Sequence, residues 1–183
     1  MIQILSVQDI KQAELESYSM GESSNSLVKK AANSISNYIV SELPKDINTN
    51  IVIISGAGNN GNDGILAGCY LATKGYNVTI FRFKNKNLVL PNFVKLEVNE
   101  RKKAKDIEYF EFSNVNYFEK QLLEQLALAN IIVDSLLGIG MNRPLSEDLS
   151  KLVNIINSSR SNKNTVISID IPTGINGDTG QVY

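Results

Sequence analysis

A loop of glycine, asparagine and aspartate holds the first residues whose types and spacing could do chemistry. It reads GAGNNGNDG over residues 56–64 and follows the apolar run Ile51–Ser55. Glycine tolerates positive φ and lets the backbone approach a ligand closely, and N–H groups at a following helix start bind anions. The pattern therefore predicts a nucleotide-like ligand at the carboxyl end of a strand.

Two aspartates, Asp134 and Asp170, each end an otherwise apolar strand further along the chain. Such acids are costly unless they are paired or used, although a single one more often forms a turn or caps a helix. Ligands of an open parallel sheet bind beyond the carboxyl ends of its strands. We therefore expect one neighbourhood to contain Asn60, Asp63, Asp134, Asp170 and Thr173.

The loop also satisfies the dinucleotide pattern G-x-G-x-x-G, which alone is a weak signal. Arg82 and Lys84 stand at the end of the next strand, where a dehydrogenase that uses NAD carries an acid, so an NADP-dependent dehydrogenase is one interpretation. Against it, polar side chains crowd residues 59–63, where a dinucleotide fold usually keeps bare backbone. The chain also lacks a histidine that could act as the base, so this interpretation ranks last.

Oxygen donors in the same neighbourhood would suit a hard cation. Asn60, Asp134 and Thr173 offer an amide, a carboxylate and a hydroxyl, and so few formal charges favour a monovalent ion. The absence of histidine excludes His-based triads, most zinc sites and imidazole acid–base catalysis within this chain. Proton transfer must then use a carboxylate, a lysine, a tyrosine, a hydroxyl or water.

The composition is that of a globular domain with a real core, with 183 residues of which 43% are hydrophobic. A net charge of -1 gives no electrostatic case for binding nucleic acid or an anionic membrane. No apolar stretch approaches transmembrane length, and the N-terminus lacks the features of a signal peptide. The single cysteine, Cys69, fits a reducing compartment, so we expect a cytoplasmic protein.

Hydrophobic periodicity and turn residues predict alternating strands and helices. The expected strands are 51–55, 77–83, 107–112, 131–134 and 165–171. The expected helices are 7–17, which starts with a capping box at Ser6 and Asp9, then 26–43, 64–74, 116–129 and 146–158, with a less regular one around 92–98. This alternation indicates an α/β fold with a parallel sheet covered on both faces. No repeat or linker divides the chain, so residues 1–183 are expected to form a single domain.

Four motifs, in this order along the chain, resemble the YjeF N-terminal domain family, which includes the NAD(P)H-hydrate epimerases. They are NSLVKKAA at 25–32, GNNGNDG at 58–64, VDSLLGIG at 133–140 and SIDIPTGINGDTG at 168–180. The resemblance implies a three-layer Rossmann-like fold. It also implies epimerisation of hydrated NADH or NADPH between R and S forms, after which a companion NAD(P)H-hydrate dehydratase, separate or fused, restores the normal cofactor.

The resemblance also assigns site residues. Carried over by motif, the substrate would be bound by Asn59, Asn60, Gly61, Asn62, Asp63, Gly138, Ile139, Gly140, Met141, Asn142, Arg143, Pro144 and Asp170. Potassium would be bound by Asn60, Asp134 and Thr173. Asp170 is the candidate catalytic acid or base at the damaged ring, because loss and return of water, or ring opening, each require proton transfer. Asp63 is the alternative, unless it only caps the following helix.

Three further expectations come with the family. Its members continue with more strands, so this chain is expected either to lack its last strands or to be part of a longer protein. Members are often dimers, which makes a homodimer through the N-terminal helices one expectation. The resemblance also allows a non-catalytic scaffold that binds nucleotides or proteins, which is the alternative to an epimerase.

Overall fold

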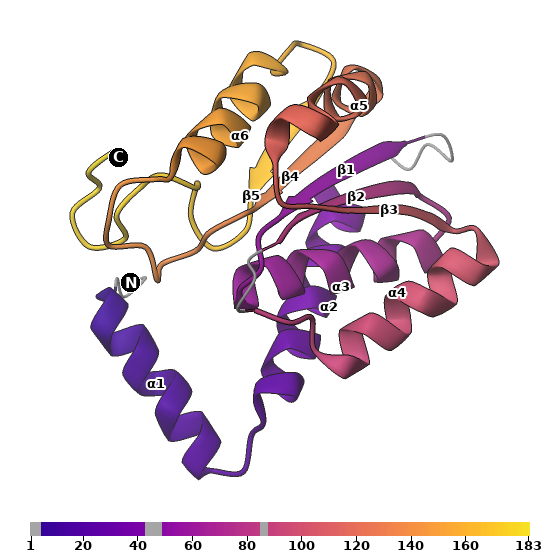
Figure 1. The fold of residues 1–183 in the computed structure, drawn as a ribbon. Coiled ribbons are helices and arrows are strands. Elements are labelled where there is room, and N and C mark those ends of the chain that lie inside the picture. The colour runs from indigo at the N-terminus through magenta and orange to yellow at the C-terminus, as the bar shows by residue number, and fades with distance from the viewer. Residues whose placement is uncertain (1–4, 43–48, 85–87) are drawn as a thin grey trace.

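A parallel sheet runs through the middle of the molecule (Figure 1). The computed structural model describes residues 5–42, 49–84 and 88–183. In this part of the chain the five strands are β1 (Asn50–Ser55), β2 (Asn77–Phe83), β3 (Ile107–Phe112), β4 (Ile131–Ser135) and β5 (Thr165–Ser168). Their spatial order is β3-β2-β1-β4-β5, and each neighbouring pair is parallel. The carboxyl ends of all the strands therefore lie at one edge of the sheet.

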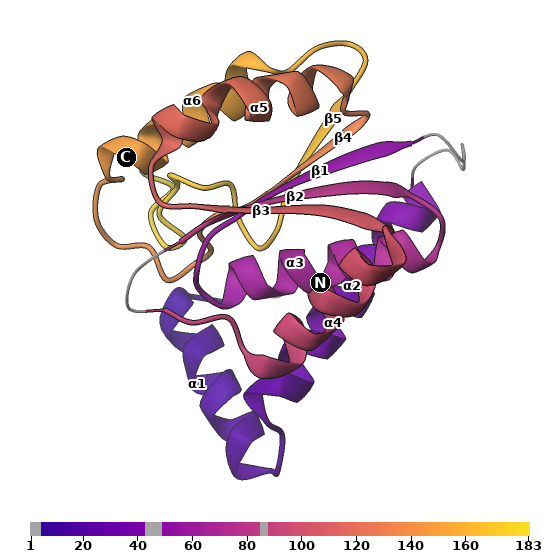
Figure 2. The same ribbon diagram turned by 45° about the vertical axis from the view of Figure 1, so that its right-hand side comes forward.

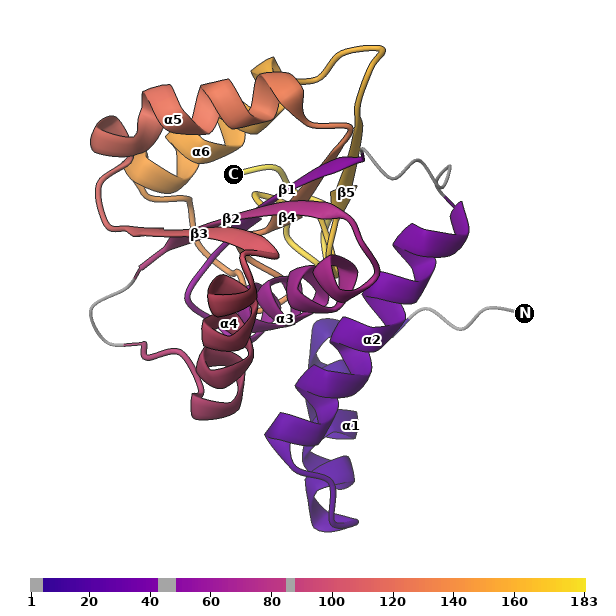
Figure 3. The ribbon, with the colours of Figure 1, turned by 90° about the vertical axis from the view of Figure 1, so that its right-hand side faces the viewer.

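Helices cover both faces of this sheet (Figures 2 and 3). The helices are α1 (Val7–Ser19), α2 (Ser24–Glu42), α3 (Asn59–Thr73), α4 (Asn92–Ala104), α5 (Val115–Leu128) and α6 (Glu147–Ser158). One core cluster joins the sheet to α2, α3 and α4, and a second joins it to α5 and α6. The predicted fold class, a three-layer Rossmann-like α/β fold, is confirmed.

The central strand β1 shows why the sequence forms this arrangement. Ile51 and Ile53 contribute to the core on the α3 side, whereas Val52 and Ile54 contribute to the core on the α5 side. Side chains alternate between the faces of a sheet, so a strand covered on both faces must be apolar throughout. Burial of both faces therefore fixes β1 in the centre.

Helix α3 begins at Asn59, five residues before the predicted start at Gly64, so that part of the prediction is wrong. Gly58 is the N-cap and makes no side-chain capping hydrogen bond. A Cβ at Gly61 would collide with the carbonyl oxygen of Gly56, so only glycine lets the first turn close tightly on the end of β1. Asp63 consequently lies inside the helix and is not its cap.

Two other elements differ in length from the predictions. Helix α4 runs to Ala104 because basic residues in its last turn suit the helix dipole and Lys105 closes it in the left-handed conformation. Strand β5 ends at Ser168, three residues early, and Asp170 has a φ of 68°. That backbone conformation is incompatible with a strand, so the chain turns at the edge of the sheet.

Helix α1 projects from the body of the molecule, as Figure 2 shows. The predicted capping box at Ser6 and Asp9 is present, with the Asp9 N–H donating to Ser6 Oγ at 3.1 Å. None of the residues of α1 is buried. Its position therefore depends on contacts near its start rather than on the core.

Candidate active site

Asp134 joins the loops that follow β4 and β5. Its Oδ1 accepts hydrogen bonds from Thr173 Oγ1 at 2.7 Å and from the Leu136 N–H at 3.2 Å. Its Oδ2 accepts from the Thr173 N–H at 2.9 Å and from Ser168 Oγ at 3.3 Å. Asp134 and Thr173 are each only 6% exposed. The carboxylate therefore holds the two loops in place, which explains how an acid can end an apolar strand.

Asp170 lies on the exposed side of the same edge. Its Oδ2 accepts a hydrogen bond from the Ile139 N–H at 2.7 Å, in the loop after β4. A Cβ at Gly138 would collide with this carboxylate, so glycine is required there for the two loops to meet. Positive φ at a residue other than glycine costs roughly 1 kcal/mol or more, so the surrounding contacts must hold Asp170 in this conformation. The carboxylate is thus fixed in direction and open to a ligand.

Buried polar groups without partners surround the start of α3. Both amide atoms of Asn60, Oδ1 of Asn62 and Oδ1 of Asp63 are buried and form no hydrogen bond with any described residue. Asn60 Cβ lies 3.4 Å from the place a Cβ would take on Gly138, so this helix start adjoins the loop that contacts Asp170. Because buried polar groups are nearly always satisfied, these atoms have hydrogen-bonding capacity left for a ligand or for water.

Asp63 differs from an ordinary carboxyl group in its proton affinity. Burial, together with the negative charges of Asp170 and of Glu14 on α1, raises the pKa of Asp63 to about 7. A group with this pKa can gain or lose a proton near neutral pH.

The glycines of residues 56–64 play a different part from the one predicted. None of them has a positive φ in this fully described segment. A Cβ at Gly56 would collide with the carbonyl of Leu136, and one at Gly64 with the side chain of Ser135. Gly56 and Gly64 are therefore needed because β1 and α3 pack so closely against the end of β4 and the loop after it.

The loop after β4 lines a cavity of about 290 Å³ with residues from both ends of the described chain. The lining residues are Val7, Gln8, Lys11, Ile139, Gly140, Met141, Asn142, Asn176 and Asp178. Three other predicted site residues, Arg143, Pro144 and Asn59, are exposed but do not line this cavity. The residues of α1 were missed by sequence reasoning, since nothing in the helix pattern shows that it reaches this loop.

A larger hollow of about 450 Å³ lies over α2 and α3, away from these groups. It is lined by Lys29, Lys30, Asn33, Tyr70, Thr73 and Lys74. It contains none of the predicted site residues. We therefore place the candidate site at the carboxyl edge of the sheet.

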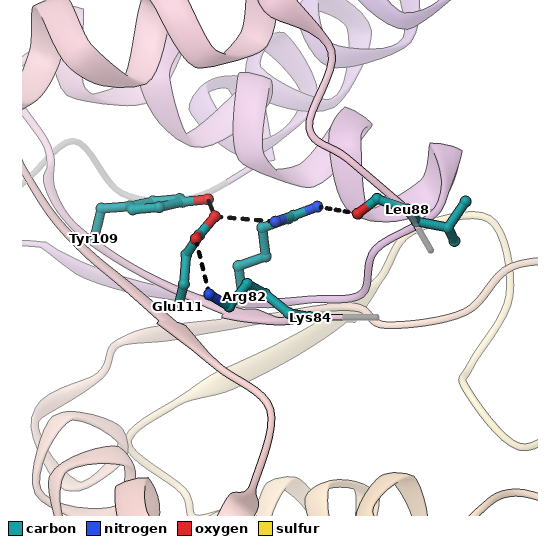
Figure 4. Close-up of polar contacts among 5 residues, drawn as sticks. All are labelled: Arg82, Lys84, Leu88, Tyr109 and Glu111. Carbon is teal, nitrogen blue, oxygen red and sulfur yellow. Dashed lines mark hydrogen bonds and ion pairs between the residues drawn. The ribbon is translucent and has the colours of Figure 1, made fainter. Parts of the chain in front are cut away.

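Arg82 is not available to bind a phosphate (Figure 4). It is 3% exposed, and its Nη1 donates to Glu111 Oε1 at 2.9 Å while Nη2 donates to the Leu88 carbonyl at 3.3 Å. Lys84 Nζ lies 3.4 Å from Glu111 Oε2. Burial raises the pKa of Glu111, but hydrogen bonds from Tyr109 and Arg82 outweigh it and lower the pKa overall. The basic pair of the dehydrogenase interpretation thus holds β2, β3 and the segment at Leu88 together.

The potassium ligands expected from the sequence are Asn60, Asp134 and Thr173. Among the described residues, no group of three or more His, Cys, Asp or Glu side chains could hold a metal ion. Asp134 and Thr173 are hydrogen-bonded to each other, whereas the amide oxygen of Asn60 has no partner in the described chain.

No helix in the described ranges has the length and apolar character to cross a membrane.

Comparison with known proteins identifies the family. The family described as YjeF-related protein N-terminus matches residues 24–183. The chain is 34% identical over 141 residues to a Bifunctional NAD(P)H-hydrate repair enzyme Nnr of Thermofilum pendens, covering 71% of this chain and 24% of that protein. It is 33% identical over 158 residues to an NAD(P)H-hydrate epimerase of Elusimicrobium minutum, covering 84% of this chain and 65% of that protein. A third relative, the NAD(P)H-hydrate epimerase of Limosilactobacillus reuteri, is 30% identical over 156 residues, with 85% and 66% covered.

The same fold is found in the crystal structure of yeast ynu0, YNL200c, with a TM-score of 0.85 and 23% identity, covering 100% of this chain and 75% of that one. The chain spans about a quarter of the bifunctional relative and about two thirds of the two epimerases. The family match covers most of the chain and all of the candidate active site except the contribution of α1. The chain therefore belongs to the YjeF-related N-terminal family.

Proposed function

We propose that this protein is an NAD(P)H-hydrate epimerase, which interconverts the R and S forms of hydrated NADH and NADPH. Relatives at 30–33% identity carry that name. The observation that best supports it here is the placement of two carboxyl groups, Asp63 and Asp170, beside the unpartnered amides of Asn60 and Asn62. Hydrogen-bonding groups without partners suit a polar ring, and the carboxyl groups suit proton transfer.

Asp170 is the catalytic residue in this proposal. The damaged carbon carries a hydroxyl group next to the ring nitrogen. When Asp170 protonates that hydroxyl, water leaves and the nitrogen lone pair forms a C=N bond; water then returns to the other face and gives a proton back to Asp170. Asp170 Oδ2 is held by Ile139, while Oδ1 has no hydrogen-bond partner in the described chain and is available to the substrate. Asp63 lies close enough for the charge of Asp170 to raise its pKa, and it provides a second site for the proton.

The substrate-binding residues in the proposal are those carried over by motif at residues 59–63 and 138–144. Asn60, Asn62 and Asp63 contribute the unpartnered groups of α3. Ile139, Gly140, Met141 and Asn142 line the cavity beside Asp170. The substrate would therefore lie between the first turns of α3 and the loop after β4.

Potassium is the proposed ion, held by Asn60, Asp134 and Thr173. One carboxylate with an amide and a hydroxyl suits a monovalent cation, and the buried Asn60 amide has no described partner. Asp134 already accepts four hydrogen bonds from Leu136, Ser168 and Thr173. The ion would neutralise Asp134 and hold the loops together rather than act as a Lewis acid.

The proposed functional partner is an NAD(P)H-hydrate dehydratase, separate or on the same chain. The bifunctional repair enzymes are about four times as long as the stretch they share with this chain, which supports a second activity beside this domain in those relatives. A homodimer through α1 and a cytoplasmic location stay predictions; the free, buried Cys69 suits a reducing compartment.

The epimerase proposal is tested by supplying the R hydrate together with a dehydratase that accepts only the S hydrate. In potassium buffer, the protein should accelerate cofactor recovery over spontaneous epimerisation. Asp170→Asn is the informative variant, because Asn adopts positive φ readily and keeps the shape of the side chain without its acid–base capacity. It should lose at least about 100-fold of the rate, which is the usual contribution of general acid–base catalysis.

Glu124→Gln is a suitable control for this experiment. Its carboxylate is exposed on α5, and its ion pair with Lys120, at 3.9 Å, contributes little. Wild-type protein that gives no acceleration would refute the proposal. Nucleotide binding without turnover, unchanged in Asp170→Asn, would instead support a scaffold.

A further inference from the structure

Helix α1 is fixed at its start to the segment that follows β5. The Val7 N–H donates to Asp178 Oδ1 at 2.7 Å. A Cβ added to Gly177 would lie 2.8 Å from Val7 Cγ2, so the helix rests directly on that glycine. Figure 1 shows the first turn of α1 beside the loops that follow β4 and β5. A helix that buries none of its residues is thus held in a defined place.

The anchored helix forms one wall of the 290 Å³ cavity. Val7, Gln8 and Lys11 line it from α1, opposite the loop after β4. Ile139 belongs both to this cavity and to the contact with Asp170, because its N–H donates to that carboxylate at 2.7 Å. The cavity therefore begins next to the proposed catalytic group and extends outward under α1.

Charge distinguishes Lys11 from the other lining residues. It is the one basic residue among the described residues that line the cavity, and none of the described residues forms an ion pair with it. The acidic lining residue, Asp178, is oriented toward the backbone of Val7. Asp170 and Glu14 add further negative charge at this edge. A phosphate brought here would meet repulsion from carboxylates, so an unpaired ammonium is the group that could offset it.

We propose that Lys11 is a substrate-binding residue, whose ammonium group contacts phosphate oxygens of the dinucleotide in the cavity beneath α1. Gln8, one turn earlier on the same wall, donates a hydrogen bond from its side-chain amide N–H to the same phosphate. The proposal rests on the epimerase function, since it assumes a dinucleotide whose damaged ring lies at Asp170. The family match begins at residue 24, so no family motif points to this helix.

Kinetics with two substrates test the role of Lys11 and identify the phosphate. Lys11→Met keeps the length of the side chain but removes its charge. For hydrated NADH, which has only the pyrophosphate, and for hydrated NADPH, we expect KM to rise about 5- to 10-fold while kcat stays within about twofold. A rise with both substrates indicates the pyrophosphate, and a rise with hydrated NADPH alone indicates the 2′-phosphate. Lys11→Arg should recover most of the affinity.

Lys95→Met is the matched control, because Lys95 is an exposed helix lysine on α4 away from the cavity. An unchanged KM for both substrates in Lys11→Met, with active wild-type protein, would overturn the proposal and leave the epimerase function intact. If wild-type protein shows no turnover, calorimetry with NADPH and inorganic pyrophosphate decides: weaker binding by Lys11→Met supports the phosphate contact. Equal binding, or no binding by wild type, contradicts it.

Discussion

Asp63 and Asp170 repel one another at the carboxyl edge of the sheet, and burial keeps water from screening Asp63 fully. The fold tolerates this because Asp170 is exposed and receives the Ile139 N–H. Asn60 and Asn62 add buried groups without partners at the same place. These residues reduce the stability of the ligand-free protein, as is typical of groups retained for binding and proton transfer.

The protonation of Asp63 should appear in the pH dependence of stability. Its pKa is about 7 in the folded protein against 3.8 as the reference. The folded state therefore holds a proton that the unfolded state releases, so the free energy of unfolding should fall as pH rises from about 4 to 7 and level off above. At pH 8, Asp63→Asn should be more stable than wild type by roughly 2 kcal/mol, allowing for partial exposure to water.

Urea unfolding of both proteins at a series of pH values measures this difference. The gain from Asp63→Asn should shrink as the pH approaches 4. Asp106→Asn is a control, because Asp106 forms an ordinary ion pair with Arg101 away from this edge. Parallel stability curves for wild type and Asp63→Asn would show that Asp63 titrates normally.

At the scale of the elements, the polar contact between β2 and β3 is partly buried, whereas the one that holds α1 is at the surface. Arg82 is buried and pairs with Glu111, so it fastens two strands and the segment at Leu88. Helix α1 is joined through Asp178 at its first turn and has no buried residue. The first contact stabilises the body of the protein, whereas the second positions a wall of the cavity without contributing to the core.

Removing the Asp178 carboxylate should therefore loosen α1 without unfolding the protein. In Asp178→Ala the Val7 N–H loses its acceptor, and with it a charge-assisted hydrogen bond at the start of the helix. Hydrogen exchange of amides in α1 should become faster, while the free energy of unfolding measured in urea changes by less than about 0.5 kcal/mol. Asp178→Asn keeps an acceptor oxygen and should remain closer to wild type. A large loss of global stability in Asp178→Ala would show that α1 is part of the cooperative core.

At the scale of the whole molecule, the proposed ion joins α3, the end of β4 and the loop after β5. Potassium should raise the melting temperature relative to lithium at equal ionic strength, because it binds the folded state alone. At ten times its Kd the gain is about 1.4 kcal/mol, or roughly 3–6 °C for a protein of this size. Asn60→Ala should abolish the difference between the two salts.

Asn154→Ala provides the comparison, since Asn154 is exposed on α6 and lies outside the site. It should retain the full potassium effect. Equal melting temperatures in potassium and lithium for wild type would refute the ion site. The same result would leave the roles of Asp170 and Lys11 open to their own tests.

Local sequence was sufficient for much of this architecture. The apolar runs at β1 and β4 can only be strands covered on both faces, and the capping box at Ser6 starts α1 as predicted. Parallel connections then bring the strand ends together, which is why Asp134, Asp170 and Thr173 could be placed at one edge from the sequence. The start of α3 could not be predicted, because its glycine-rich first turn forms only through close packing against Gly56.

The remaining features were decided by tertiary structure, because each depends on groups far apart in the chain. Arg82 looked like a phosphate ligand until Glu111, 29 residues away, was seen to neutralise it. The proton affinity of Asp63 depends on burial and on charges from α1 and the end of β5. Lys11 lines the cavity only because Val7 is hydrogen-bonded to Asp178, which lies 171 residues further along the chain. Short-range periodicity specifies elements, whereas the electrostatics of a site depend on distances that arise only after the elements pack.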